Sequence, residues 1–166
     1  MSWTSIFDNT NWKSGVPGDN VGGSGSCIWT GSVWAVTSDP SDTMEGVTIA
    51  NAATWNAGYR PAFVRVTMAI TSGGTQSIAL YVFGSHNTVR VLTDYSVLTS
   101  VDTSSTQLVY ALTYPDGTST YDITDLGLYQ PTLGTWTADI TNIEFGSGSS
   151  PTAFWTDKVK CSESDS

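Results

Sequence analysis

Charged side chains are scarce in this sequence of 166 residues, and the basic ones are the scarcest. They make up 13% of the chain, about half of the ~25% that is usual in globular domains. Six lysines and arginines stand against 15 aspartates and glutamates, which gives a formal net charge of −9 at pH 7. This charge repels phosphate groups, and the six scattered cations form no basic patch. We therefore expect no nucleic-acid partner.

Residues that bind metals or transfer protons are also few. The sequence holds one histidine, His86, within the turn-like run 84–87, and two cysteines, Cys27 and Cys161. These three residues cannot complete a structural zinc site, and no phosphate-binding loop, dinucleotide fingerprint or nucleophile elbow occurs. The cysteines are predicted to stay reduced, with a bridge between them as the alternative. We expect no cofactor, no bound metal and no catalytic residue, with a calcium ion near the turn that contains Asp122 and Asp125 as the lesser alternative.

Long apolar runs are missing as well. No stretch approaches the ~18 apolar residues of a membrane span, so no membrane partner is expected. The first residues contain neither the basic region nor the apolar region of a signal peptide. The sequence thus predicts synthesis in the cytoplasm without a secretion step.

Small hydroxyl residues, glycine and aromatic residues are abundant instead. The chain contains 22 serines, 25 threonines, 16 glycines, seven tryptophans and seven tyrosines. This composition is poor in strong helix formers and rich in strand and turn formers. It excludes a coiled coil and a helical bundle.

Residues 63–70 show the alternation of a half-buried strand, with Val64, Val66, Met68 and Ile70 on one side. Further strands are predicted over residues 76–83, 88–93, 95–101, 106–114, 121–129 and 136–145. The turn at 71–75 predicts that strands 63–70 and 76–83 form a hairpin, and Gly31-Ser32 predicts another within 28–36. About eight to ten short strands without helices predict an all-β fold, an antiparallel β-sandwich.

Two predicted strands contain irregularities. In 136–145, Ile140 and Ile143 fall on opposite parities, and a bulge near Thr141 would bring both into the core. In 121–129, the residues Asp122 to Leu126 resemble a helix start, so one helical turn is the alternative to a strand.

Tryptophan is the most informative residue type, because four of the seven lie in the first 34 residues among frequent glycines. Such a segment builds no core of its own. We therefore expect an extended arm over residues 1–45, the sandwich over 46–146, and a flexible joint and tail over 147–166. Indole rings contact sugar rings and anchor protein interfaces, while packing in the core is the alternative role. The candidate interface or ligand contacts are Trp3, Trp12, Trp29, Trp34 and Trp55.

The closing strand 136–145 ends in the step Ile143-Glu144-Phe145 and follows a series of hydroxyl-rich strands. In this order of elements, residues 59–145 resemble the jelly-roll sandwiches of carbohydrate-binding modules and of bacteriophage accessory proteins. The resemblance implies a jelly-roll-like sandwich. It assigns no ligand-facing residue, because no diagnostic motif accompanies it.

Three functions are open at this point. The first is a non-enzymatic virion protein, for capsid decoration or in a tail fibre, made in the host cytoplasm and bound to identical copies or other virion proteins. The alternative is a carbohydrate-binding module or adhesin that recognises surface glycans. The third, a glycosidase or lyase, needs two converging carboxylates. Asp139 and Glu144 lie five positions apart on one predicted strand, so without a bulge they face opposite sides.

Overall fold

The structure is a computed structural model that describes residues 2–5, 12–14, 26–41, 44–49, 62–86, 89–95, 98–111 and 122–147. Within these ranges the backbone alone is described for 12–14, 44–49, 81–86, 89–95, 122–125 and 147. This part of the chain forms strands and no helix, so it holds nothing helical that could span a membrane. The strands are β1 (Ser2–Ser5), β2 (Trp12–Ser14), β3 (Ser26–Trp29), β4 (Trp34–Thr37), β5 (Met44–Ile49), β6 (Phe63–Ser72), β7 (Gln76–His86), β8 (Val89–Tyr95), β9 (Thr99–Val101), β10 (Thr106–Ala111), β11 (Asp122–Tyr129) and β12 (Thr137–Ser147).

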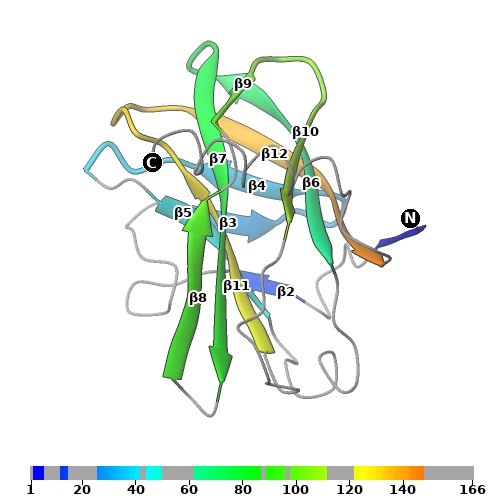
Figure 1. Cartoon of the computed structure of the whole chain (residues 1–166). Coiled ribbons are helices and arrows are strands. Elements are labelled where there is room, and N and C mark those ends of the chain that lie inside the picture. Colours follow the sequence, from blue (N-terminus) through cyan, green and yellow to red (C-terminus); the bar gives the residue numbers. More distant parts are fainter. Residues whose placement is uncertain are drawn as a thin grey trace, which may run out of the picture.

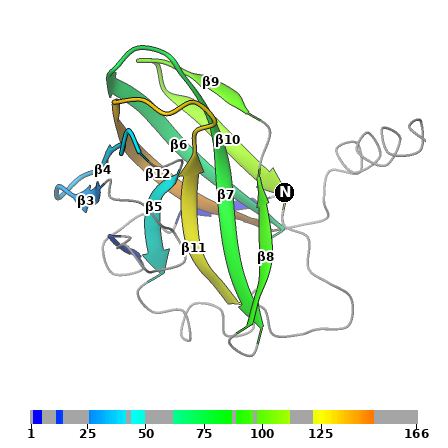
Figure 2. The same ribbon diagram turned by 90° about the vertical axis from the view of Figure 1, so that its left-hand side faces the viewer.

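The strands form two antiparallel sheets. Sheet A has the order β10-β6-β12-β4-β3, with β1 paired to the end of β12. Sheet B has the order β2-β5-β11-β7-β8, with β9 paired to the start of β7. Figure 1 shows the strands of one sheet crossing in front of those of the other, and Figure 2 shows the two layers from the side. The predicted all-β antiparallel sandwich is confirmed.

The core lies between the sheets and is lined by the alternate residues of their strands. On β6 the predicted inward set Val64, Val66, Met68 and Ile70 is buried, with at most 2% of each side chain exposed. Opposite residues come from sheet B, including Ile78, Leu80, Leu126 and Leu128. Trp34, Trp136 and Phe145 are the largest fully buried side chains of the described residues.

The predicted hairpin of 63–70 with 76–83 is wrong. β6 pairs with β10 and β12, whereas β7 pairs with β8, β9 and β11. The turn between them therefore carries the chain from sheet A to sheet B. Gly73 and Gly74 make this possible with φ angles of 98° and 75°. A Cβ on Gly73 would lie 2.7 Å from the carbonyl oxygen of Thr135, so the turn packs tightly against the start of β12.

The hairpin around Gly31 is confirmed. β3 pairs with β4 so that Trp29 lies opposite Trp34. The loop is closed by a hydrogen bond of 3.0 Å from the Thr30 amide to the Val33 carbonyl, and Gly31 adopts a φ of 103°. Here a positive φ at glycine reverses the chain within one sheet.

The bulge near Thr141 is also confirmed. The register of β12 against β6 shifts between Ile140 and Asn142, and both Ile140 and Ile143 are buried. The helical turn considered for 121–129 is wrong, because β11 is a strand held between β5 and β7. Pairing on both edges supplies the backbone hydrogen bonds that a single helical turn would have to make alone.

Polar contacts fix one end of the sandwich. Ser38 Oγ accepts a hydrogen bond from the Trp136 amide at 2.7 Å and donates one to the Gly134 carbonyl at 2.8 Å. The Trp136 indole Nε1 donates to Gln130 Oε1. These bonds tie the loop after β4 to the loop before β12.

The described parts of residues 1–45 contribute strands to both sheets, with β1, β3 and β4 in sheet A and β2 in sheet B. An arm over the whole of this region, and the domain limits at 45 and 146, stay predictions. The tail from 148 onward lies outside the described residues.

Candidate ligand-binding face

The side of sheet A that is turned away from the core, called the outer face here, is built by strand alternation. Because Val64, Val66 and Met68 of β6 are buried, the residues between them point outward. On β12 the bulge at Thr141 moves the outward positions from odd to even numbers. The outward residues of the two central strands are Phe63, Arg65, Thr67, Ala69 and Thr71 on β6, and Thr137, Asp139, Thr141, Asn142, Glu144 and Gly146 on β12.

An aromatic pair lies at one end of the outer face. β1 places Trp3 opposite Gly146, and Gly146 lies opposite Phe63 on β6. The Trp3 and Phe63 rings have centroids 6.2 Å apart and are tilted by 55°. A Cβ on Gly146 would lie 3.0 Å from Trp3 Cζ3, so the absence of a side chain there lets the indole lie against the sheet. Trp3 is half-buried in this position.

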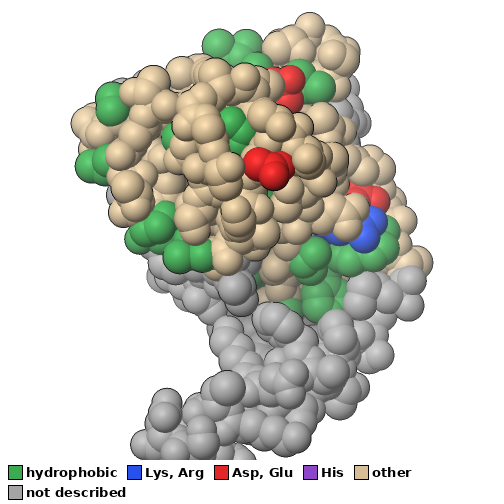
Figure 3. Space-filling model, turned by 90° about the horizontal axis from the view of Figure 1, so that it is seen from above, with side chains coloured by type: hydrophobic (Ala, Val, Ile, Leu, Met, Phe, Trp, Pro, Cys, Tyr) green, Lys and Arg blue, Asp and Glu red, His purple; other side chains and the backbone are tan. Residues whose placement is uncertain are grey.

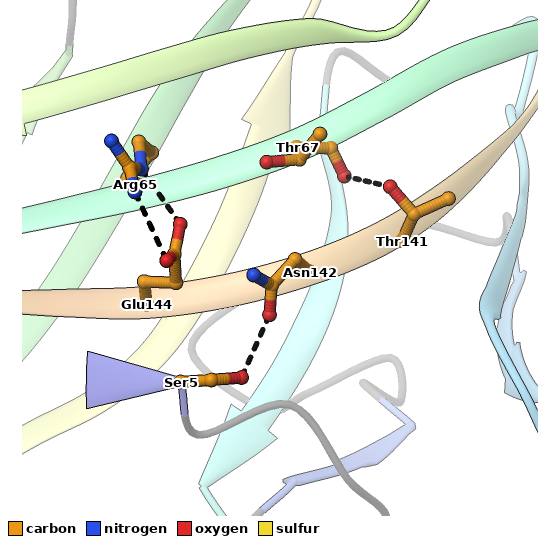
Figure 4. Close-up of polar contacts among 6 residues, drawn as sticks. All are labelled: Ser5, Arg65, Thr67, Thr141, Asn142 and Glu144. Carbon is orange, nitrogen blue, oxygen red and sulfur yellow. Dashed lines mark hydrogen bonds and ion pairs between the residues drawn. The ribbon is translucent and has the colours of Figure 1, made fainter. Parts of the chain in front are cut away.

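Arg65 and Glu144 form a bidentate ion pair beside this tryptophan. Arg65 Nε lies 2.6 Å from Glu144 Oε2, and Nη2 lies 3.0 Å from Oε1. The side chains are 20% and 13% exposed, so water only partly screens the pair. Arg65 Cζ also lies 4.0 Å from the centroid of the Trp3 ring, within the range of a cation–π contact. Figure 4 shows Glu144 reaching from β12 to Arg65 on β6.

Amide and hydroxyl groups continue the outer face along β12. Ser5 Oγ donates a hydrogen bond of 2.8 Å to Asn142 Oδ1, which leaves the amide nitrogen of Asn142 pointing away from Ser5 (Figure 4). Thr141 Oγ1 donates to the Thr67 carbonyl at 3.3 Å. Beyond Asp139 the Oγ1 atoms of Thr71 and Thr137 lie 2.6 Å apart. The face therefore offers both donors and acceptors.

The charge of the outer face is slightly negative. Arg65 is the one cationic residue among those whose side chains are described, and Asp139 and Glu144 share its face because of the bulge. Figure 3 shows the blue atoms next to red and green ones. No group of three potential metal ligands occurs among the described residues. Asp139 lies between Ala35 on β4 and Ala69 on β6, so small neighbours flank its carboxylate.

The structure separates the predicted contact tryptophans. Trp3 lies on the outer face, whereas Trp34 is a core residue, 2% exposed, and its Nε1 donates to no described residue. Trp29 packs against that core with its ring 5.5 Å from Trp34. Trp12 lies in β2 with its side chain undescribed, and Trp55 lies outside the described residues. The contact roles of these five residues stay predictions, and the burial of Trp34 favours core packing for that residue.

Sequence reasoning did not single out Arg65, Asn142 or Ser5. The alternation of 63–70 placed Arg65 on the polar side of its strand, which was the available signal. Glu144 was considered as a carboxylate paired with Asp139, and the bulge does bring these two to one face. The partner of Glu144 is Arg65, however, from a strand 79 positions away.

Neither a protein-family model nor a curated protein sequence matches this chain. Solved structures of carbohydrate-binding modules do match it. A mutant of the family 29 module CBM29-2 has a TM-score of 0.56 and 12% identity, and the match covers 89% of this chain and 94% of the module. The module CBM29_1 from Piromyces equi has a TM-score of 0.52 and 9% identity, with 88% and 91% covered.

A family 11 carbohydrate-binding module from Clostridium thermocellum, solved with a β-1,3-1,4-mixed-linked tetrasaccharide, has a TM-score of 0.51 and 14% identity. That match covers 87% of this chain and 94% of the module. At these identities the likeness shows a shared β-sandwich fold. The predicted resemblance to carbohydrate-binding modules is thus confirmed for the fold, and the resemblance to bacteriophage proteins stays a prediction.

Proposed function

We propose that this chain binds carbohydrates without cleaving them, and that the outer face of sheet A is its contact surface. The observation that carries this proposal is the grouping of a half-buried indole, a bidentate ion pair and the Asn142 amide on one sheet face. An indole ring contacts the apolar face of a sugar ring. Amide and charged groups beside it exchange hydrogen bonds with the sugar hydroxyls. The fold likeness to carbohydrate-binding modules supports the same function.

The environment of Glu144 supports binding rather than catalysis. A glycosidase needs one carboxyl group that donates a proton to the leaving oxygen and a second that acts as base or nucleophile. Both oxygens of Glu144 accept hydrogen bonds from Arg65, so the carboxylate is already engaged by a neighbouring strand. Glu144 is therefore placed to orient Arg65. The virion role, self-association and virion partners stay predictions from the sequence, because no described contact favours them.

The test is a glycan array followed by calorimetric titration of its hits. We expect the substitution Trp3→Ala to weaken binding about tenfold, which corresponds to ~1.4 kcal/mol of lost contact. The matched control is Trp29→Ala, which removes an indole from the other side of the same sheet and should change the dissociation constant less than twofold. Asn142→Ala should weaken binding without removing an aromatic ring.

Two results would count against the proposal. The first is an array without hits for the folded wild-type chain. The second is full binding by Trp3→Ala together with loss of binding by Trp29→Ala, which would move the contact surface away from the outer face.

A further inference from the structure

Arg65 carries the positive charge of the outer face, and the Nε–Nη2 edge of its guanidinium group is already in use. A guanidinium group binds a carboxylate best through two parallel N–H···O bonds. In this chain Nε and Nη2 make those bonds to Oε2 and Oε1 of Glu144, at 2.6 and 3.0 Å. A carboxylate of a ligand cannot occupy the same edge while Glu144 holds it.

The neighbouring indole limits the freedom of the guanidinium group. Arg65 Cζ lies over the Trp3 ring, 4.0 Å from its centroid, so the guanidinium group is in contact with the indole. Nη1 and the second hydrogen of Nη2 make no hydrogen bond to another residue in the described part of the chain, so the Nη1–Nη2 edge keeps its donors. These donors suit the hydroxyl and ring oxygens of a neutral sugar. A carboxylate at that edge would instead have to share a positive charge that Glu144 already balances.

The remaining charges of the face oppose an acidic ligand. Glu144 and Asp139 both project from the outward side of β12, and Arg65 alone balances them among the described side chains. An acidic glycan would therefore approach two carboxylates and one cation that is already paired. The chain as a whole adds to this repulsion with its net charge of −9.

We infer that Glu144 restricts the ligand of this face to uncharged glycans, because it occupies the Nε–Nη2 edge of Arg65 and balances the positive charge that would otherwise bind a uronate. The inference rests on the proposed function and identifies Glu144 as a specificity-determining residue. Removal of its charge should convert Arg65 into a binding group for acidic sugars. The substitution Glu144→Gln does this while it keeps the length of the side chain and one acceptor oxygen.

The experiment compares pairs of glycans that differ in charge alone. The probes are mannohexaose and the β-1,4-mannuronate hexamer, and cellohexaose and its C6-oxidised uronate form. For the wild type we expect at least tenfold tighter binding of the neutral member of a pair in 20 mM NaCl. For Glu144→Gln we expect this preference to fall to threefold or less. The control Asp139→Asn removes the same charge from the same strand but leaves Arg65 paired, and should change the preference less than twofold.

Salt provides a second measurement that needs no variant. A preference that arises from charge should shrink in 500 mM NaCl, because the screening length falls well below 10 Å. Equal binding of both members by the wild type, an unchanged preference in folded Glu144→Gln, or a preference insensitive to salt would each overturn the inference. If the wild type binds none of the four probes and none of the array glycans, the proposed function is refuted, and the inference with it.

Discussion

The Arg65–Glu144 pair gives the sharpest quantitative prediction, which is a coupling free energy from a double-mutant cycle. The cycle consists of the wild type, Arg65→Gln, Glu144→Gln and the double variant. Fully exposed ion pairs contribute at most ~1 kcal/mol, whereas breaking a buried pair costs about 3–5 kcal/mol. With exposures of 20% and 13% and two hydrogen bonds, this pair lies between the two limits. We expect a coupling of about 1.5–2 kcal/mol.

The single variants should not cost the same. Glu144→Gln keeps a neutral acceptor for Arg65, so its loss of stability should be about 1 kcal/mol, as for a weakened charge-assisted bond. Arg65→Gln leaves a half-buried carboxylate without a cation and also removes the contact with Trp3, which adds about 0.5–1 kcal/mol. We therefore expect Arg65→Gln to be the more destabilising of the two.

Urea denaturation followed by far-ultraviolet circular dichroism measures all four free energies of unfolding, with constant m-values as the check on two-state behaviour. Repetition in 1 M NaCl should leave most of the coupling, because the pair is partly shielded from solvent. A coupling below ~0.5 kcal/mol would refute the reasoning. It would show that the Arg65–Glu144 pair is no stronger than an exposed ion pair, and that other anions can reach the Nε–Nη2 edge of Arg65.

Two further predictions concern the fold. Gly73→Ala should lower the free energy of unfolding by about 3 kcal/mol, because a positive φ of 98° combines with a Cβ 2.7 Å from Thr135 O. Gly74→Ala, with a φ of 75° and open space, should cost about 1 kcal/mol, and equal losses would contradict the steric argument. Ile143→Ala should cost about 2–5 kcal/mol because Ile143 is fully buried. Val109→Ala at a 44% exposed site should cost less than ~0.5 kcal/mol in the same denaturation assay.

The fold class could be predicted from the sequence because its signal is local. Alternation along 63–70 assigns each side chain to the core or the surface without knowledge of any partner strand. The same rule located the bulge, since Ile140 and Ile143 could share the core only if one extra residue lay between them. Burial of Val64, Met68 and Ile143 confirms these assignments.

Strand pairing could not be predicted in the same way. A short glycine turn between two alternating strands is compatible with a hairpin in one sheet and with a crossing between two sheets. The decision depends on contacts with residues far away in the sequence, here the packing of Gly73 against Thr135 and Trp136. The alternation is identical in both cases, because β6 and β7 each present one apolar side to the same core.

The candidate site was less predictable than the fold, because distant segments build it. Ser5 and Asn142 are 137 positions apart, and Arg65 and Glu144 are 79 apart. No periodicity links such residues, and the pairing of β1 with β12 brings the first two together. Counting tryptophans likewise could not separate Trp3 on the outer face from the buried Trp34, because the strand that carries each residue decides its exposure.

One irregularity of the backbone connects the core with the candidate site. Without the extra residue at Thr141, strict alternation after Ile140 would turn Asn142, Glu144 and Gly146 toward the core and Ile143 outward. A carboxylate would then be buried without Arg65, and Trp3 would have no flat surface to lie on. The bulge avoids both outcomes at once, since it keeps the apolar residues inside and moves the polar ones to the strand side where Arg65 points. The polar groups of the outer face and the packing of Ile143 in the core therefore depend on the same extra residue, Thr141.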